Sequence, residues 1–195
     1  MDTNTWAITP PATDDDYYFA AGAVGGAGAI TLLKTKVGTY GAGYKVTFFS
    51  TGDSTTRTWT IVGHAVGTAP GAVTTEVVAA GNNATTTSTN YFDTLTSITA
   101  SGAMTGNQKV GFSAATVALP ATYIHSVYWI SESSAGSIII NRNSATGTEL
   151  LKIDTPGAVG ADSIDCGRIR VMGSAATDFA LITPTTVTKY TLICG

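Results

Sequence analysis

The sequence predicts an all-β protein, built as two small antiparallel β-sandwich or jelly-roll-like units preceded by an extended N-terminal arm. Short runs of Thr, Val, Ile and aromatic residues recur along the 195 residues, and Gly, Asn, Ser and Asp interrupt them. No apolar pattern keeps the 3.6-residue period of a helix over a helical length. Hydrophobic residues make up 44% of the chain, which is enough to form a core.

The arm is expected over residues 1–26. Thr9-Pro10-Pro11 favours an extended, polyproline-like backbone, and the run Asp14-Asp15-Asp16 discourages a compact helix through charge repulsion. Aromatic side chains in such a segment need a surface on which to bury, either on their own domain or on a neighbouring subunit. The second reading makes them interface anchors, and these are Trp6, Tyr17, Tyr18 and Phe19.

The first β unit is expected over residues 27–118. Alternation in Arg57–Val62 places Trp59 and Ile61 on one face of a strand. In Tyr91–Thr99 the same rule places Phe92 and Leu95 on opposite faces. The strands expected in this unit are Ala29–Lys36, Tyr44–Phe49, Arg57–Val62, Val73–Ala79, Tyr91–Thr99 and Gln108–Phe112.

The second β unit is expected over residues 119–195, after a seam near Ala118-Leu119-Pro120-Ala121. One continuous sandwich is the alternative to two units. The strands expected here are Tyr123–Ile130, Ser137–Asn141, Glu149–Ile153, Arg168–Met172, Phe179–Ile182 and Val187–Ile193.

The charge pattern argues against several classes of partner. The formal net charge is −3, and the ten Lys and Arg residues are scattered, so no basic stripe is available to follow a phosphate backbone. An acidic balance gives no attraction to anionic lipid. The uncharged segment Tyr17–Leu33 is rich in Gly and Ala and follows three aspartates, which is unlike a signal peptide or a membrane span. We therefore expect no nucleic acid, no membrane, and synthesis in a cytoplasm.

No residue pattern points to catalysis, a metal or a cofactor. His64 and His125 are the only histidines, and neither has a Cys or carboxylate at ligand spacing in the sequence. No serine lies in a nucleophile motif. The three aspartates are expected to be a solvated run and not a Ca²⁺ loop. Cys166 and Cys194 are expected to be buried thiols, with a disulfide as the alternative if strands bring them within about 6 Å. The chain is thus not expected to be an enzyme.

Two groups of motifs resemble β modules of tailed-bacteriophage structural proteins. In the first unit they are Thr58-Trp59-Thr60-Ile61-Val62-Gly63 and the run from Thr87 to Thr99. In the second unit they are Ile124-His125-Ser126-Val127-Tyr128 and the run from Glu149 to Pro156. The resemblance implies a virion protein without catalytic residues.

Small size, sparse charge (12% of residues) and the aromatic arm then favour a capsid decoration, or cement, protein. It would bind the outside of the major capsid protein lattice as a homotrimer and stabilise the capsid. The alternatives are a head-fibre, neck or tail component, and a carbohydrate-binding module. In the last case the stacking residues would come from Trp59, Tyr91, Tyr128 and Trp129.

Overall fold

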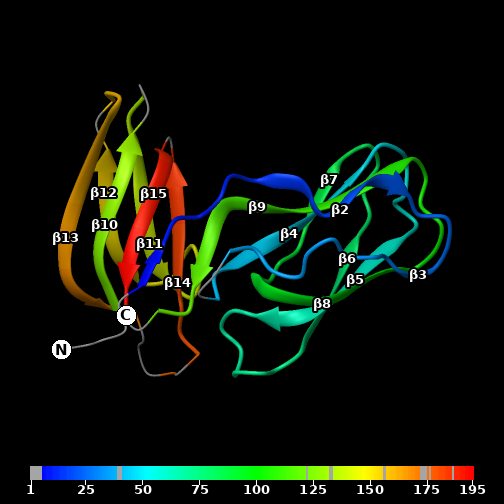
Figure 1. Cartoon of the computed structure of the whole chain (residues 1–195), viewed down its shortest axis with the longest axis horizontal. Helices are drawn as coiled ribbons and strands as arrows, with labels where there is room; N and C mark the ends of the chain where they lie inside the picture. Colours follow the sequence, from blue (N-terminus) through cyan, green and yellow to red (C-terminus); the bar gives the residue numbers. More distant parts are fainter. Residues whose placement is uncertain are drawn as a thin grey trace. The chain divides into compact units, whose positions relative to one another are not determined.

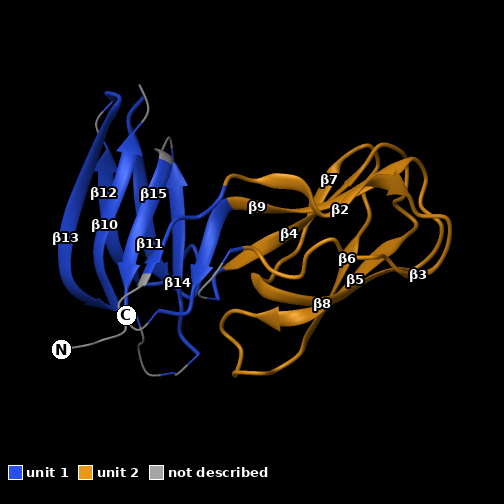
Figure 2. Cartoon of the chain, viewed as in Figure 1, with its two compact units in different colours: residues 1–11, 38–42, 115–195 blue, residues 12–37, 43–114 orange. Residues whose placement is uncertain are grey.

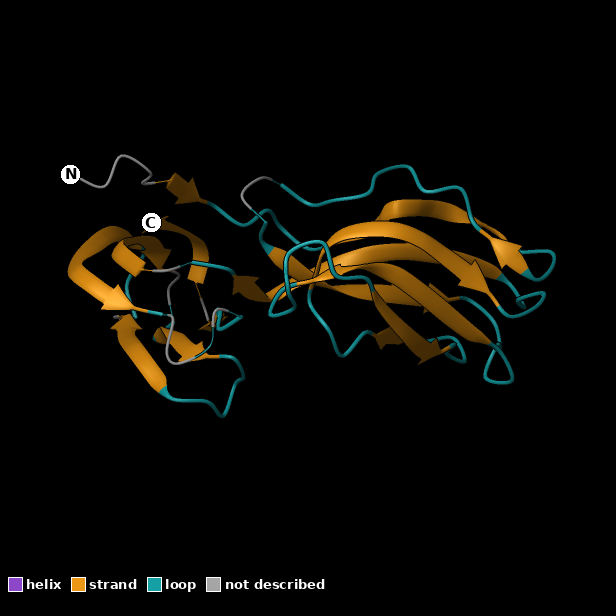
Figure 3. Ribbon diagram, turned by 90° about the horizontal axis from the view of Figure 1, so that it is seen from below, coloured by secondary structure: helices purple, strands orange, loops and turns teal. Residues whose placement is uncertain are grey.

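A computed structural model of the chain describes residues 6–38, 41–121, 123–131, 134–155, 157–171, 175, 177–185 and 187–195. Every regular element in these ranges is a β-strand, and Figure 3 shows strands joined by loops. The all-β class is therefore confirmed. The chain divides into two compact units, coloured separately in Figure 2. Unit 1 consists of Met1–Pro11, Gly38–Ala42 and Ala115–Gly195, and unit 2 consists of Ala12–Val37 and Gly43–Ala114.

Unit 1 consists of two antiparallel sheets, whose strands form two layers in Figure 1. The first sheet has the order β1-β15-β10-β13, and its strands are β1 (Trp6–Ile8), β15 (Val187–Cys194), β10 (Tyr123–Ser131) and β13 (Gly160–Arg170). The second has the order β12-β11-β14-β9, and its strands are β12 (Glu149–Thr155), β11 (Gly136–Arg142), β14 (Ala180–Thr185) and the end of β9 (Asn107–Leu119).

The strand order of unit 1 is that of a jelly roll. Numbered along the chain, its eight strands read 1-8-3-6 in one sheet and 5-4-7-2 in the other. Apart from the β11–β12 hairpin, each strand is followed by a strand of the opposite sheet, as in an eight-stranded double-sheet jelly roll. Fully buried side chains from both sheets form the core, and they include Ile124, Val127, Leu192, Ile138, Ile140 and Ile182.

Unit 2 is inserted between the first two strands of this jelly roll. Its strands are β2 (Asp14–Ala23), β3 (Gly28–Ala29), β4 (Gly43–Ser50), β5 (Thr58–Ala65), β6 (Thr74–Ala79), β7 (Thr85–Thr87), β8 (Phe92–Ala100) and the first part of β9. The main order is β9-β4-β8-β5-β6, and β2, β3 and β7 pair with β9, β8 and β4 respectively. The two units therefore do not simply follow one another in sequence, and the expected boundary after residue 118 falls inside β9.

The expected arm over residues 1–26 is not confirmed by its described part. Residues 6–8 pair with β15 in unit 1, and residues 14–23 pair with β9 in unit 2. Charge repulsion within the run from Asp14 to Asp16 opposes a helix but not a strand, because neighbouring strand residues point to opposite faces. Residues 1–5 lie outside the described residues.

The core of unit 2 is aromatic. Trp59 and Ile61 are 1% and 0% exposed, so the alternation expected in β5 is confirmed. The Trp59 ring stacks on Phe48 at 5.2 Å between centroids, and Phe112 contacts Tyr44 edge-to-face at 5.2 Å. Burial raises the pKa of Tyr44 to about 12, with a smaller contribution from Tyr17.

Two expectations for unit 2 are wrong. Phe92 and Leu95 are both buried, because the β5–β8 pairing shifts register after Val62 and again after His64. Such a bulge adds a residue and reverses the alternation that follows it. The expected strand Ala29–Lys36 pairs only at Ala29. Beyond its first residues this segment is held by single bonds to different strands, such as Leu33 N–H to the Tyr18 carbonyl oxygen at 2.8 Å.

Candidate functional site

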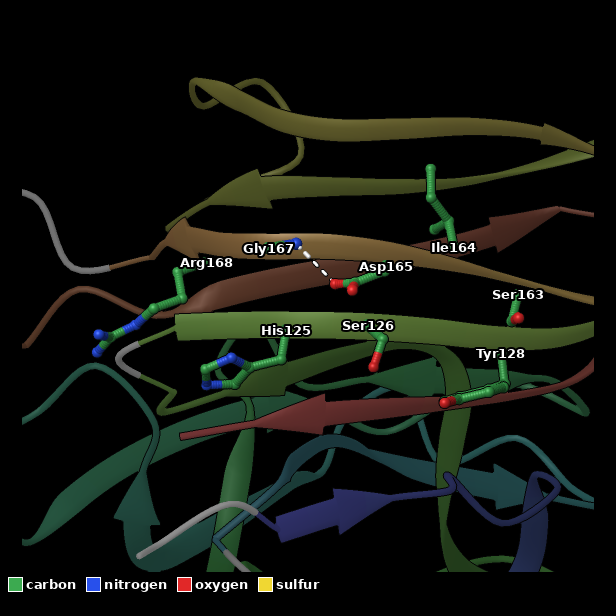
Figure 4. A pocket seen from close by; sticks show the side chains of 8 residues that line it. All are labelled: His125, Ser126, Tyr128, Ser163, Ile164, Asp165, Gly167 and Arg168. Carbon is green, nitrogen blue, oxygen red and sulfur yellow. Dashed lines mark hydrogen bonds between the residues drawn. The ribbon is translucent and has the colours of Figure 1, made fainter. Parts of the chain in front are cut away.

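A polar hollow on the β10–β13 strand pair of unit 1 is the clearest candidate site (Figure 4). Its volume is about 560 Å³, within the usual range for small-molecule sites. The walls are made by His125, Ser126 and Tyr128 of β10 and by Ser163, Asp165 and Arg168 of β13. Ser126 pairs with Asp165 and Tyr128 pairs with Ser163, so these four side chains occupy two adjacent rows of the sheet.

The hollow exists because the two strands lose their regular pairing there. Ile124 pairs with Ile169, and the next pair is Ser126 with Asp165. His125 alone therefore lies opposite the three residues from Cys166 to Arg168. Irregularities of this kind turn side chains out of the normal alternation and occur often beside binding sites.

Gly167 allows the distortion in β13. Its φ of 64° lies in the left-handed region, which glycine adopts without steric cost. Its N–H donates to Asp165 Oδ1 at 2.9 Å, the bond drawn as a dashed line in Figure 4. The segment from Asp165 to Gly167 thus forms a tight local turn that sets the position of the Asp165 carboxylate.

The charges of the hollow come from one cation and one anion. The Arg168 guanidinium lies over the Tyr123 ring, with Cζ 4.3 Å from the ring centroid, a favourable cation–π distance. His125 Nε2 is buried and has no hydrogen-bond partner among the described residues. The His125 ring therefore lines the hollow without presenting this nitrogen to a ligand.

Burial, followed by the charge of Asp165, raises the pKa of the neighbouring Cys166 thiol. A thiol so held is a poor nucleophile.

Most of the side chains that line the hollow are polar. Within the described ranges, no three His, Cys, Asp or Glu side chains gather closely enough to hold a metal ion. The hollow combines hydroxyl groups, a carboxylate, a guanidinium, the rings of His125 and Tyr128 and the apolar side chain of Ile164. Mixed linings of this kind are common in sites for small molecules.

The expected interface anchors have different surroundings. Tyr18 is 1% exposed inside unit 2, so its ring has no surface left for a neighbouring subunit. Tyr17 packs edge-to-face on Phe112 at 5.0 Å and donates to the Lys36 carbonyl oxygen at 3.0 Å. Phe19 is half-buried in the same strand. Trp6 lies in β1, and its side chain is outside the described residues. For Tyr17 and Tyr18 the structure favours packing on their own unit.

Of the four expected stacking residues, the structure favours Tyr128. Trp59 is 1% exposed and Trp129 is 7% exposed, so neither offers a ring face to a sugar. Tyr91 is half-buried, with Lys45 Nζ 5.4 Å from its ring centroid. Tyr128 is 49% exposed and lines the hollow. Nothing in the sequence pattern singles out its neighbours Ser126, Ser163 and Arg168, although a glycine within a strand, such as Gly167, is a known signal for a bulge.

The histidine outside the hollow has a structural partner that sequence spacing did not suggest. His64 Nδ1 lies 2.9 Å from Asp93 Oδ1, and His64 Nε2 lies 3.2 Å from the Ala69 carbonyl oxygen. Both ring nitrogens thus face acceptors from the chain itself. The pair thus connects the loop after β5 to β8.

The two cysteines are free thiols. Cys166 is half-buried on β13 and Cys194 is buried on β15, with β10 between these strands. Two strand spacings are about 9.6 Å, which is too far for a disulfide. Burial raises the pKa of the Cys194 thiol to about 12.

A second feature of the surface is the end of the sheet of unit 2. β6 pairs with β5 and is the last strand of the order β9-β4-β8-β5-β6. Val77 in β6 and Val73 just before it are 62% and 72% exposed. The one charged side chain of β6, Glu76, accepts hydrogen bonds from the Asn90 N–H at 3.0 Å and from Asn90 Nδ2 at 2.9 Å.

Comparisons with known proteins give no relative for the chain. No family model matches it, and no curated protein or solved structure does either. The resemblance to bacteriophage modules therefore remains a prediction from the sequence. The described residues include no helix long and apolar enough to cross a membrane.

Proposed function

We propose that the chain is a structural virion protein of a tailed bacteriophage, and most specifically a decoration protein that binds the outside of the major capsid protein lattice. The proposal rests on the sequence resemblance and on the assembly surfaces that the fold offers. The observation that carries it is the unprotected edge strand β6 of unit 2.

An exposed edge strand usually carries a device that stops it from pairing with other chains, such as Lys, Pro or a bulge. β6 has the sequence Thr-Thr-Glu-Val-Val-Ala, and its pairing with β5 runs without a register shift. Its carboxylate is engaged by Asn90, so charge protects this edge poorly. A strand of this kind is well suited to a partner that adds its own strand or covers the exposed valines.

The mechanism is mechanical. Each copy contributes a modest contact, and repetition over a symmetric lattice multiplies that contact into strong attachment. A homotrimer at the threefold points of the lattice would place three β6 edges on the capsid at once. The sparse charge, 12% of residues, is consistent with a surface that is largely covered by neighbours. No chemical step is required, and we do not propose an enzyme.

The test is sedimentation of purified protein with undecorated capsids, using Val77→Lys as the variant. Val159→Lys is the matched control, because Val159 is also exposed, at 76% against 62% for Val77, but lies in unit 1 outside β6. We expect the wild type and the control to bind in hundreds of copies per capsid. Val77→Lys should stay in the supernatant, because a lysine on the edge blocks strand addition.

The outcomes separate the alternatives. Equal binding of Val77→Lys and the wild type would remove β6 from the mechanism. A few copies at one vertex, seen by cryo-electron microscopy, would favour a head-fibre, neck or tail component. A monomeric wild-type protein that binds no viral particle would refute the proposal.

A further inference from the structure

We propose that the outer face of strands β15, β10 and β13 in unit 1 binds a second copy of the same chain across a twofold axis. Tyr128 of β10 lies at the centre of this contact. Two ion pairs, each between Lys189 of one copy and Asp165 of the other, lie on either side of it. The inference goes beyond attachment to a capsid and uses unit 1 alone.

The outer face of β10 carries exposed apolar side chains. Val127 and Trp129 point into unit 1 and are 0% and 7% exposed. Tyr128 and Ile130 alternate with them along the strand and are 49% and 41% exposed. Ala161 of β13, which pairs with Ile130, is exposed as well. Adjacent exposed apolar side chains with a polar surround are typical of a surface that binds another protein.

Tyr128 stands between two hollows of this face. Towards Ser126 and Asp165 lies the polar hollow of about 560 Å³. Towards Ile130 and Lys189 lies a second hollow of about 210 Å³, which Tyr128 also lines. A side chain that projects between two hollows can interlock with the same side chain of a second copy, because a twofold contact joins one surface to itself.

The strand register places one charge on each side of Tyr128. Tyr128 pairs with Thr191 on β15 and with Ser163 on β13. Lys189 lies two residues from Thr191 in one direction along the strands, and Asp165 lies two residues from Ser163 in the opposite direction. Each charge is thus one strand and one row away from Tyr128, which is roughly 8 Å from the strand spacing and the rise per residue.

Both charges can bind a partner. Lys189 and Asp165 are exposed, and neither forms an ion pair with another residue that the structure describes. Asp165 Oδ1 accepts a hydrogen bond from Gly167 N–H, but a carboxylate has about four acceptor positions. Arg168 lies beyond Asp165 and is held over the Tyr123 ring, so the contact does not depend on its guanidinium.

These positions make the face complementary to itself. A twofold axis through Tyr128, perpendicular to the line from Lys189 to Asp165, exchanges the two ends of that line. Lys189 of each copy then meets Asp165 of the other, and the two tyrosine rings are buried between the ion pairs. Turning one copy half a turn within the plane would place like charges together, so electrostatics selects a single orientation. Neighbouring threefold points of a closed lattice are related by twofold axes, so this contact can join copies at adjacent points.

The experiment is analytical ultracentrifugation of the full-length protein over a concentration series. We expect a dimer, or an even-numbered oligomer built from it. Lys189→Glu should raise the dissociation constant at least about tenfold, because it replaces two attractions with two repulsions. Tyr128→Ala should weaken association about tenfold or more, because it removes the central ring from both copies.

Two further variants test the charge pairing. Asp165→Asn removes the charge but keeps an acceptor for Gly167 N–H, and it should weaken the dimer without disturbing the fold. The double variant Lys189→Glu/Asp165→Lys restores opposite charges across the axis, so it should regain most of the affinity that Lys189→Glu loses.

Lys152→Glu is the matched control. It makes the same charge change in the same unit, at a lysine that is 45% exposed. Lys152 lies on β12 in the other sheet, where it pairs with Asp154, so this variant should dimerise as the wild type does.

Each result decides the question. A monomer at about 0.1 mM, or an odd-numbered oligomer, would overturn the inference. So would a dimer that Lys189→Glu and Tyr128→Ala leave intact, or one that Lys152→Glu weakens equally. Failure of the double variant to regain affinity would overturn the pairing of Lys189 with Asp165. A monomer that still sediments with capsids would refute this contact alone, because capsid attachment is measured through Val77 in unit 2.

Discussion

Gly111→Ala tests the close approach of β2 to β9 in unit 2. A methyl group at Gly111 would overlap the Asp14 carbonyl oxygen and lie 2.6 Å from Asp15 Cα. Ordinary contact with a Cβ begins at 3.4 Å. Because both obstacles are backbone atoms, no change of rotamer relieves them, and β2 has to move away by about 0.8 Å or more in a densely packed interior.

The expected loss of unfolding free energy follows from the contacts that this movement disrupts. β2 pairs with β9 at Asp14↔Phe112 and at Phe19↔Val110, on both sides of Gly111. The edge-to-face contact of Tyr17 with Phe112 depends on the same approach. Overpacking costs about 1–3 kcal/mol, and a clash with backbone falls at the upper end. We therefore expect unit 2 to lose about 3 kcal/mol of unfolding free energy, which lowers the Tm of a unit of this size by roughly 15 °C.

The assay is urea unfolding with pulsed hydrogen exchange and mass spectrometry, because a two-unit chain need not unfold in one step. Amides of β2 and β9 should lose protection at lower urea than in the wild type. Gly25→Ala is the control: Gly25 is exposed, and an added Cβ meets no atom within 4 Å. Its effect should stay within about 0.5 kcal/mol. A loss below about 1 kcal/mol for Gly111→Ala, with β2 still protected, would refute the reasoning.

Three further predictions follow from burial. Trp59→Ala should destabilise unit 2 by about 3–5 kcal/mol in urea unfolding, because the ring is 1% exposed and stacks on Phe48; an effect under about 1 kcal/mol would contradict this. A thiol reagent should label Cys166 in the native protein and Cys194 only after unfolding, as read by mass spectrometry, and a Cys166–Cys194 disulfide would contradict the strand spacing. Burial raises the pKa of Tyr44 to about 12 from 10.0 and that of Cys194 to about 12 from 9.0, so the unfolded chain releases these protons first. Stability should therefore fall as pH rises from about 9 to 12, and Tyr44→Phe should flatten the fall; the same pH profile in this variant would rule out Tyr44 as a source.

Regular strands could be predicted from the sequence because alternation reports burial directly. β5 is the clearest example, where Trp59 and Ile61 are buried as expected. The first half of β13 could not be predicted, since Ala161-Asp162-Ser163 has no apolar alternation. β13 is an edge strand whose residues from Gly160 to Asp165 are all exposed, so nothing in its sequence had to match a core.

The connectivity of the jelly roll could not be predicted either. Its first strand, β1, is three residues long and pairs with the last strand, β15, across the length of the chain. A local pattern carries no information on such a partner. The aromatic residues 17–19 were correctly expected to need a burial surface, but the choice between their own unit and a neighbour depended on β9, where Phe112 contacts Tyr17.

Where the alternation of side chains between the two faces of a strand fails, the structure brings together polar groups that lie far apart in the sequence. Gly63 stands at the β5–β8 bulge, where any side chain would collide with the Thr94 carbonyl oxygen, and the pair His64–Asp93 lies beside it. Gly167 stands at the irregularity between β10 and β13, and the polar hollow lies beside it. A regular antiparallel pair fixes which side chains are neighbours through its period of two, whereas a bulge brings a different set together. The first of these sites is filled by the chain's own acceptors and serves the fold. The second leaves a volume of about 560 Å³ lined by hydroxyl, carboxylate, guanidinium and aromatic groups and by the apolar side chain of Ile164. In both places the loss of regular pairing, and not the alternation of the strands, decides which polar side chains become neighbours.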